Sequence, residues 1–350
     1  MSEFLSGQTL SRTFYTQTVH PLLDQHFPDL PHAAAHLGSG SDVLGFDDPT
    51  SRDHDWGPSV YLLLPAQHMM HAETVRETII KHLPRTVCGH PTRIQGRYRL
   101  YVTTVEAYLW RLLQWNVETA LKPADWLSFP SQLLRVIQAG AVHHDGAGKW
   151  TKVRERLRWY PHDVWLYLMA ASWQRIGQED HLHGRAGQVG DELGSALIAS
   201  RLMRDIMQLC FLQERVYAPY PKWFGTGFQK LQSAEMLQPI LKDAQMAATW
   251  QARETALVAG FEFVARQHNA LNVTGPIDSE AKMFHERPFR VMSNNGIVEV
   301  LLDAIEDPAV KRLKDLPGLI GGIDHFSDST DLRSQIGWRE RVRALYAPLK

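Results

Sequence analysis

The sequence predicts an α+β protein in which an N-terminal domain built around a mixed sheet is followed by a C-terminal domain made entirely of helices. Its 350 residues correspond to about two domains. Helical and extended patterns alternate up to about residue 106, and helical periodicity dominates from there on. Hydrophobic residues make up 44% and charged residues 21%, which excludes a disordered chain. We place the domain boundary near residue 150, giving domains over residues 1–150 and 151–350.

The N-terminal domain is predicted to begin with an amphipathic helix over 5–27, which Pro28 and Pro31 interrupt. The residues that follow favour a turn-rich segment, a buried strand, a helix and a second strand, and a turn over 143–146 closes the domain. The segments in chain order are His36–Pro58, Val60–Leu64, Ala72–Leu83 and Arg97–Val105.

The C-terminal half reads as helices separated by short breaks at Pro or Gly. The longest predicted helix spans 191–217, where apolar residues at steps of three and four form a stripe expected to be buried. The stripe consists of Leu193, Ala196, Ala199, Met203, Ile206 and Cys210. The predicted helices are 108–115, 131–138, 151–158, 163–175, 191–217, 234–265 and 297–305.

Composition excludes several classes of protein. Lys and Arg number 37 against 38 Asp and Glu, a net charge of −1, so a long nucleic acid is not expected as the main partner. The two cysteines, Cys88 and Cys210, cannot form a disulfide framework. The N-terminus lacks the pattern of a signal peptide, and no run of 18 apolar residues occurs. We therefore expect a cytoplasmic protein that does not bind membranes; its oligomeric state does not follow from the sequence.

The segment from Gly38 to Gly57 carries the chemistry. A Gly-Ser turn at 40–41 offers backbone N–H groups suited to phosphate oxygens. Asp53 and Asp55 stand just before the apolar run, and in an extended chain this spacing places both carboxylates on one face. Two such carboxylates suit Mg²⁺, which keeps waters and substrate phosphates as its other ligands. Asp-rich loops also occur as ordinary turns, and we interpret Asp47–Asp48 in that way.

The pattern Gly40-Ser41-x-x-x-Gly45-x(5)-Ser51-x-Asp53-x-Asp55 resembles the signature of the DNA-polymerase-β-like nucleotidyltransferase superfamily, and most nearly its antibiotic-adenylating branch. Arg52 is an insertion relative to that branch, in which the serine directly precedes the first aspartate. The chain also resembles the bacterial family called domain of unknown function 4037 over nearly its whole length. This second resemblance rests on the segments GSDVLGFDD, SRDHDWGP and ERVYAPYPKWF, and on the short elements His268-Asn269 and Arg287-Pro288-Phe289.

The resemblance implies a nucleotidyltransferase-like N-terminal domain that a helical domain closes over. It implies transfer of a nucleoside monophosphate, AMP from ATP in the first instance, to a hydroxyl of a small molecule. Two Mg²⁺ ions, held by Asp53 and Asp55, would clamp the attacking and leaving oxygens. Gly40, Ser41 and Ser51 would bind the nucleotide phosphates.

Three further residues are candidates for the site, each with an alternative role: the resemblance points to Glu106 and Lys222, and the neighbouring glycines point to Arg185. Glu106, at the end of the second strand, would be a third metal ligand or general base, or else a carboxylate in the first turn of a helix. Lys222, among prolines and aromatic residues, would bind the triphosphate, or else be an interface lysine. Arg185, between glycines, would bind phosphate, or else be a solvated arginine of a loop.

Two other functions stay open at this point. The chain would be a nucleotide-binding regulatory module if it retained nucleotide without transferring it. It would be a toxin-like transferase if its acceptor were tRNA or protein. The basic residues are dispersed along the chain, which favours a small-molecule acceptor over RNA.

Overall fold

The computed structural model describes residues 4–52, 56–293 and 295–347. The chain folds into two compact units, each described here by itself. The first is formed by Met1–Ala120 and Gln132–Arg158, and the second by Leu121–Ser131 and Trp159–Lys350. A mixed sheet lies in the N-terminal half and helices make up the C-terminal region, so the predicted α+β class is confirmed.

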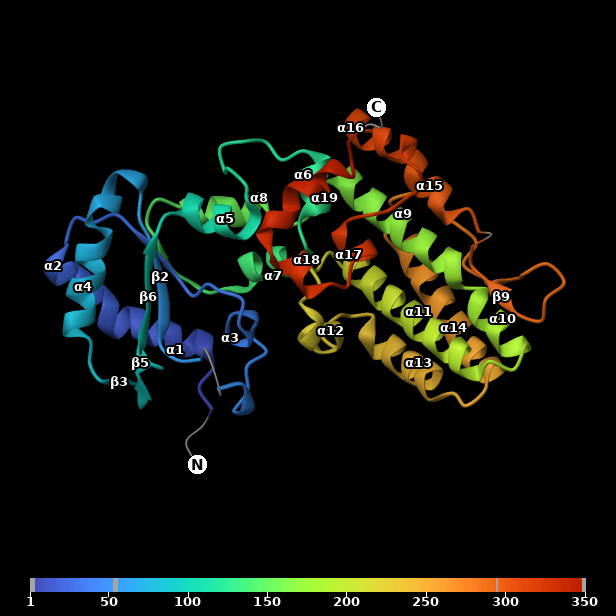
Figure 1. Cartoon of the computed structure of the whole chain (residues 1–350), viewed down its shortest axis with the longest axis horizontal. Coiled ribbons are helices and arrows are strands. Elements are labelled where there is room, and N and C mark those ends of the chain that lie inside the picture. The colour runs from blue at the N-terminus through green and yellow to red at the C-terminus, as the bar shows by residue number, and fades with distance from the viewer. Residues whose placement is uncertain (1–3, 53–55, 294, 348–350) are drawn as a thin grey trace. The chain divides into compact units, whose positions relative to one another are not determined.

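The sheet of the first unit has the strand order β5-β6-β2-β1-β7. Figure 1 labels β2, β5 and β6 of this sheet. β2 runs parallel to β6 and antiparallel to β1, and β1 runs antiparallel to β7. The two strands predicted from apolar and β-branched runs are β2 and β6, each within two residues of the predicted ends. The bounds are β1 (Ala33–Ala35), β2 (Ser59–Leu63), β5 (Arg93–Ile94), β6 (Arg97–Thr103) and β7 (Val142–Asp145).

Three strands of this sheet were not predicted: the two-residue β5, and β1 and β7. β1 consists of three alanines, which have low strand propensity and no alternation, so only its pairing with neighbours on both sides defines it. β7 includes His143 and His144, where the sequence predicts a turn; that prediction was wrong, because His144 pairs with Ala34 of β1 and His143 lies at the register irregularity between two paired residues.

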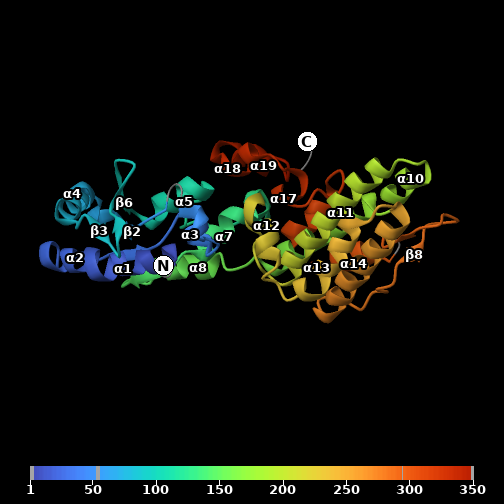
Figure 2. The same cartoon turned by 90° about the horizontal axis from the view of Figure 1, so that it is seen from below.

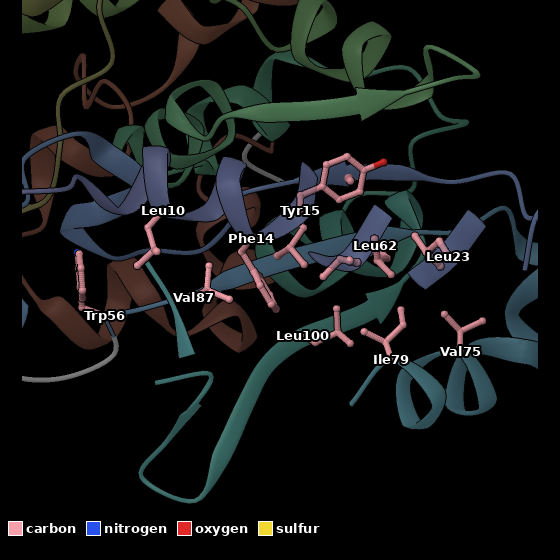
Figure 3. Packing of buried hydrophobic residues seen from close by; sticks show 13 residues of the cluster. Leu10, Phe14, Tyr15, Leu23, Trp56, Leu62, Val75, Ile79, Val87 and Leu100 are labelled. Carbon is pink, nitrogen blue, oxygen red and sulfur yellow. The ribbon is translucent and has the colours of Figure 1, made fainter. Parts of the chain in front are cut away.

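One face of the sheet is covered by the first helices of the chain. Leu10, Phe14, Val19 and Leu23 pack with strand residues and with α4 in one buried cluster (Figure 3). The step of five from Phe14 to Val19 falls on a π-helical segment, Tyr15–Val19, which keeps both residues on the same face. The helices of this unit are α1 (Gly7–Phe14), α2 (His20–His26), α3 (Ser41–Leu44), α4 (Ala72–His82), α5 (Val105–Leu113), α7 (Ser131–Ala139) and α8 (Lys149–Arg156).

The second unit contains three long helices, α9, α11 and α14. In α9 (His162–Glu179) a run of ten consecutive side chains, 164–173, is buried, so this helix forms the centre of the unit. α11 (Glu192–Gln213) packs against α9, α13 and α14 (Figures 1 and 2). The other helices of the unit are α6 (Pro123–Ser128), α10 (Leu182–Gln188), α12 (Pro221–Phe228), α13 (Ala234–Met246), α14 (Trp250–Ala270), α15 (Ile297–Asp303), α16 (Pro308–Lys311), α17 (Ile323–Phe326), α18 (Thr330–Ser334) and α19 (Arg339–Ala344).

Two helical predictions need correction here. The helix expected over 234–265 is two helices, because the chain turns after α13 and Thr249 caps α14 by accepting a hydrogen bond from the backbone N–H of Ala252. The stripe expected to be buried on α11 holds at Ala199, Ile206 and Cys210, but Leu193 is 72% exposed. No helix in the part of the chain that the structure describes is long and apolar enough to cross a membrane.

Candidate functional site

The Gly-Ser turn lies between β1 and α3. Gly40 is the N-cap of α3, and its carbonyl accepts hydrogen bonds from the backbone N–H groups of Val43 and Leu44. Gly45 ends the helix with φ of 70°, in the left-handed region that glycine adopts without strain. A Cβ atom at residue 40 would lie 2.2 Å from Asp42 Oδ1, so a larger residue there would collide with that carboxylate. The predicted turn is therefore a one-turn helix fitted closely around Asp42.

Asp42 is the charged centre of this turn and is 2% exposed. Its Oδ2 lies 3.1 Å from Nε2 of the fully buried His36 and 3.9 Å from the Arg99 guanidinium. His36 directly follows β1, while Arg99 lies on β6 opposite Ser59 of β2. Three segments of the sheet region thus contribute to one buried charge cluster, which we call the Asp42 cluster (His36, Asp42 and Arg99).

The cluster keeps Asp42 ionised. Burial by itself raises the pKa of Asp42, but the hydrogen bond from His36 and the charges of His36 and Arg99 lower it, and the net pKa is below the ordinary value. Arg99 Nη1 has no hydrogen-bond partner within the described structure, so its donor capacity is not used up. Sequence reasoning missed all three residues. Asp42 could have been found from its place directly after Gly40-Ser41, whereas Arg99 becomes relevant only through strand pairing.

The loop after α3 is tied back to α1. Oδ2 of Asp47 accepts hydrogen bonds from the Gly7 backbone N–H at 2.6 Å and from Trp56 Nε1 at 3.0 Å. Asp48 accepts from the backbone N–H of Ser51 at 2.8 Å and from its hydroxyl at 2.9 Å. Asp47 therefore connects this loop to α1 by hydrogen bonds and is not the solvated turn residue that the sequence predicts. The Ser51 hydroxyl is hydrogen-bonded to Asp48 within the loop.

The two aspartates at the centre of the sequence prediction, Asp53 and Asp55, lie outside the described residues. Trp56, directly after them, is buried and leads into β2 through Gly57 and Pro58. The described chain therefore reaches β2 at the end where Ser59 pairs with Arg99.

Glu106 lies at the other end of this strand pair. The parallel register places Leu63 opposite Thr103, and Glu106 follows in the first turn of α5, which Thr104 caps. Its carboxylate forms an ion pair with Lys149, and burial is outweighed by that contact, so the pKa of Glu106 is lowered. The distance along β6 from Arg99 to Thr103 is about 13 Å at ~3.3 Å per residue.

The two basic residues predicted to bind phosphate lie in the second unit, and both are exposed. Lys222, in the first turn of α12, has its ammonium 4.9 Å from the centre of the Trp223 ring. Arg185 lies on α10 rather than on a loop, and donates a hydrogen bond to Gln188 at 3.1 Å. The glycines beside it serve packing, because a Cβ at Gly184 or Gly187 would press on Phe289 or Trp250.

A transition-metal site has no support in the described ranges, where no group of three His, Cys, Asp or Glu side chains is arranged to hold an ion. His143 instead has a packing role. Ser11 donates to the Ser59 carbonyl at 2.5 Å, so His143 Nε2, 2.8 Å away, donates to the Ser11 hydroxyl. Burial, His36 and Arg12 lower the pKa of His143 to about 4, which leaves the ring neutral.

Comparisons with known proteins support the family resemblance. Residues 126–224 match the model of a domain of unknown function, DUF4037, which confirms the resemblance to that family over α6 to α12. The matched segment is shorter than the sequence analysis inferred and leaves the Gly40–Asp55 signature outside it. A nucleotidyltransferase-like protein from Exiguobacterium sibiricum 255-15 is similar in structure, with a TM-score of 0.33 and 12% identity over 80% of this chain and 83% of that one. A comparison with curated proteins found no match.

Proposed function

We propose that this chain is a nucleotidyltransferase that transfers AMP from ATP to a hydroxyl of a small molecule. In this proposal Asp53 and Asp55 would hold Mg²⁺, which would stabilise the negative charge on the phosphate oxygens during transfer. The acceptor hydroxyl attacks the α-phosphorus, its proton passes to a base or to water, and pyrophosphate leaves. Gly40 and Ser41 bind the β- and γ-phosphates through their backbone N–H groups.

One observation carries the proposal. A glycine-capped helical turn follows one strand of a mixed sheet, and the Ser-x-Asp-x-Asp sequence leads into the neighbouring strand. The turn is tied to the sheet through the buried carboxylate of Asp42, which contacts His36 and Arg99. Arg99 also supplies a positive charge beside the start of β2, where the triphosphate would need one.

The proposal is tested by pyrophosphate release from each of the four NTPs, with Mg²⁺ and fractionated small-molecule metabolites. We expect Asp53→Asn and Asp55→Asn each to lower the rate by about 10²-fold or more, because each removes a charge that holds metal against the triphosphate. Asp29→Asn changes an exposed carboxylate of the same unit and is expected to leave the rate unchanged. Equal rates in all three variants would rule the proposal out.

The same experiment separates the regulatory alternative. One observation favours a nucleotide-binding module without transfer. Glu106 is paired with Lys149 away from the start of β2, so it does not supply a third carboxylate for catalysis there. In that case the wild-type chain binds NTP in the presence of Mg²⁺, and Asp53→Asn weakens binding, yet no acceptor fraction releases pyrophosphate.

A further inference from the structure

The second unit contains a cavity of about 500 Å³ that the proposed transfer does not use. Its walls come from α11, from the segment that leads into α12, and from α17 and α18 with the loop between them. The volume falls in the range of pockets that bind small molecules. All of the residues that line it belong to the second unit, so the cavity is complete within that unit.

One wall is apolar and stiff. Ala218, Pro219 and Pro221 line it together with Phe224, one turn further along α12. Phe224 packs against Phe211 of α11 with ring centres 5.3 Å apart, so the Phe224 ring is held in place from behind. Proline rings and a fixed aromatic ring offer a flat surface that loses little conformational entropy when a planar group packs on it.

The lining also contains a buried guanidinium, that of Arg333. The Arg333 side chain is 7% exposed, and one of its nitrogens lies 2.6 Å from Asp324 Oδ1. The other carboxylate oxygen of Asp324 accepts a hydrogen bond from the Ser131 backbone N–H at 2.7 Å. Arg333 Nε has no hydrogen-bond partner in the described structure. Asp324 Oδ1 is held by this ion pair alone, without a hydrogen bond of good geometry. Arg333 therefore retains donor capacity, and a buried donor without a partner is costly.

A second guanidinium at the cavity belongs to Arg204 of α11. It pairs with Asp328, whose side chain is 72% exposed, while that of Arg204 is 41% exposed. Pairs this exposed contribute little stability, so a ligand anion can replace the Asp328 carboxylate at small cost. Gln208, one turn beyond Arg204, lines the same cavity with a neutral amide.

We propose that this cavity binds a small organic anion that carries a ring. Its carboxylate or phosphate takes hydrogen bonds from Arg204 and Arg333 and displaces Asp328, and its ring packs on Phe224 and the prolines. The lining combines two guanidiniums, each paired with an aspartate, with an apolar surface, and these two features select for the two parts of such a ligand. The proposal does not depend on the transfer reaction.

The test is a titration of the full-length chain with phenyl phosphate and with benzoate, followed by saturation-transfer NMR of the ligand ring protons. We expect saturable binding of at least one of the two, and weaker binding of inorganic phosphate and of phenol. Arg204→Gln should weaken binding about 10- to 100-fold, the effect of losing a charge-assisted hydrogen bond. Phe224→Leu should reduce the advantage of the ring-bearing anion over inorganic phosphate.

Arg201→Gln is the matched control. Arg201 lies on the same helix, is 60% exposed and pairs with Glu179, but it is not among the residues that line the cavity. Asp328→Asn should strengthen binding severalfold, since it removes the carboxylate that the ligand displaces. The proposal is overturned by no saturable binding to the folded wild type, by equal effects of the two arginine variants, or by weaker binding to Asp328→Asn. Thermal melts confirm that each variant is folded.

Discussion

At the scale of single residues, the Asp42 cluster ties the Gly-Ser turn to the sheet. A buried carboxylate beside a histidine and an arginine contributes to stability only while it is ionised, because its pKa is lowered in the folded chain. That contribution is fully present above the ordinary aspartate pKa of 3.8 and is lost as the pH falls through the lower, folded-state value. The geometry of the turn therefore depends on a charge that is hidden from solvent.

We expect Asp42→Asn to lower the free energy of unfolding by about 3 kcal/mol near neutral pH, because the variant leaves His36 and Arg99 without their anion. Urea unfolding measured at neutral pH and below about pH 3.8 checks the sign. The difference between wild type and variant should shrink in acid, since wild-type Asp42 then loses its own charge. A difference that stays constant with pH would mean that Asp42 acts through packing alone.

A second prediction at this scale concerns Glu106. Its ion pair with Lys149 and its place after the far end of β6 favour a helix-terminal role over metal binding. We expect Glu106→Gln and Lys149→Met to have similar effects, each changing the rate of pyrophosphate release by no more than a few-fold. A loss of orders of magnitude in Glu106→Gln alone would instead establish Glu106 as the third carboxylate.

At the scale of elements, two helices show that a glycine can either stabilise the packing of its helix or destabilise the helix itself, depending on its neighbours. Gly187 of α10 touches Trp250, and an added Cβ would lie 2.1 Å from the indole Cγ. Gly225 of α12 has no neighbour within 4 Å of that position. The first glycine is required by close helix packing, whereas the second only weakens its helix.

We therefore expect Gly187→Ala to lower the free energy of unfolding by about 1–3 kcal/mol, because a rigid indole has to move. Gly225→Ala should raise it by about 0.5–1 kcal/mol through helix propensity. Urea denaturation of the two variants side by side is the measurement. A rise in the free energy of unfolding for Gly187→Ala as well would show that helix propensity, not packing, governs α10.

At the scale of the whole molecule, net charge determines which partners are attracted. With 37 basic and 38 acidic residues the chain has no overall attraction for a polyanion. We expect total tRNA to bind more weakly than about 1 μM at ~0.15 M salt, with a shallow salt dependence. Tight binding with a steep salt slope would favour the toxin-like alternative over a small-molecule acceptor.

The sequence by itself determined the fold class, the two main strands, most of the helices and the signature around Gly40 and Ser41. These features are local: apolar periodicity and turn residues specify them within a few positions. Tertiary structure alone decided that three alanines form a strand, that residues 121–131 join the second unit, and that Arg99 meets Asp42. Each of these depends on contacts between segments distant in sequence, and short segments carry no pattern of their own that would reveal such contacts.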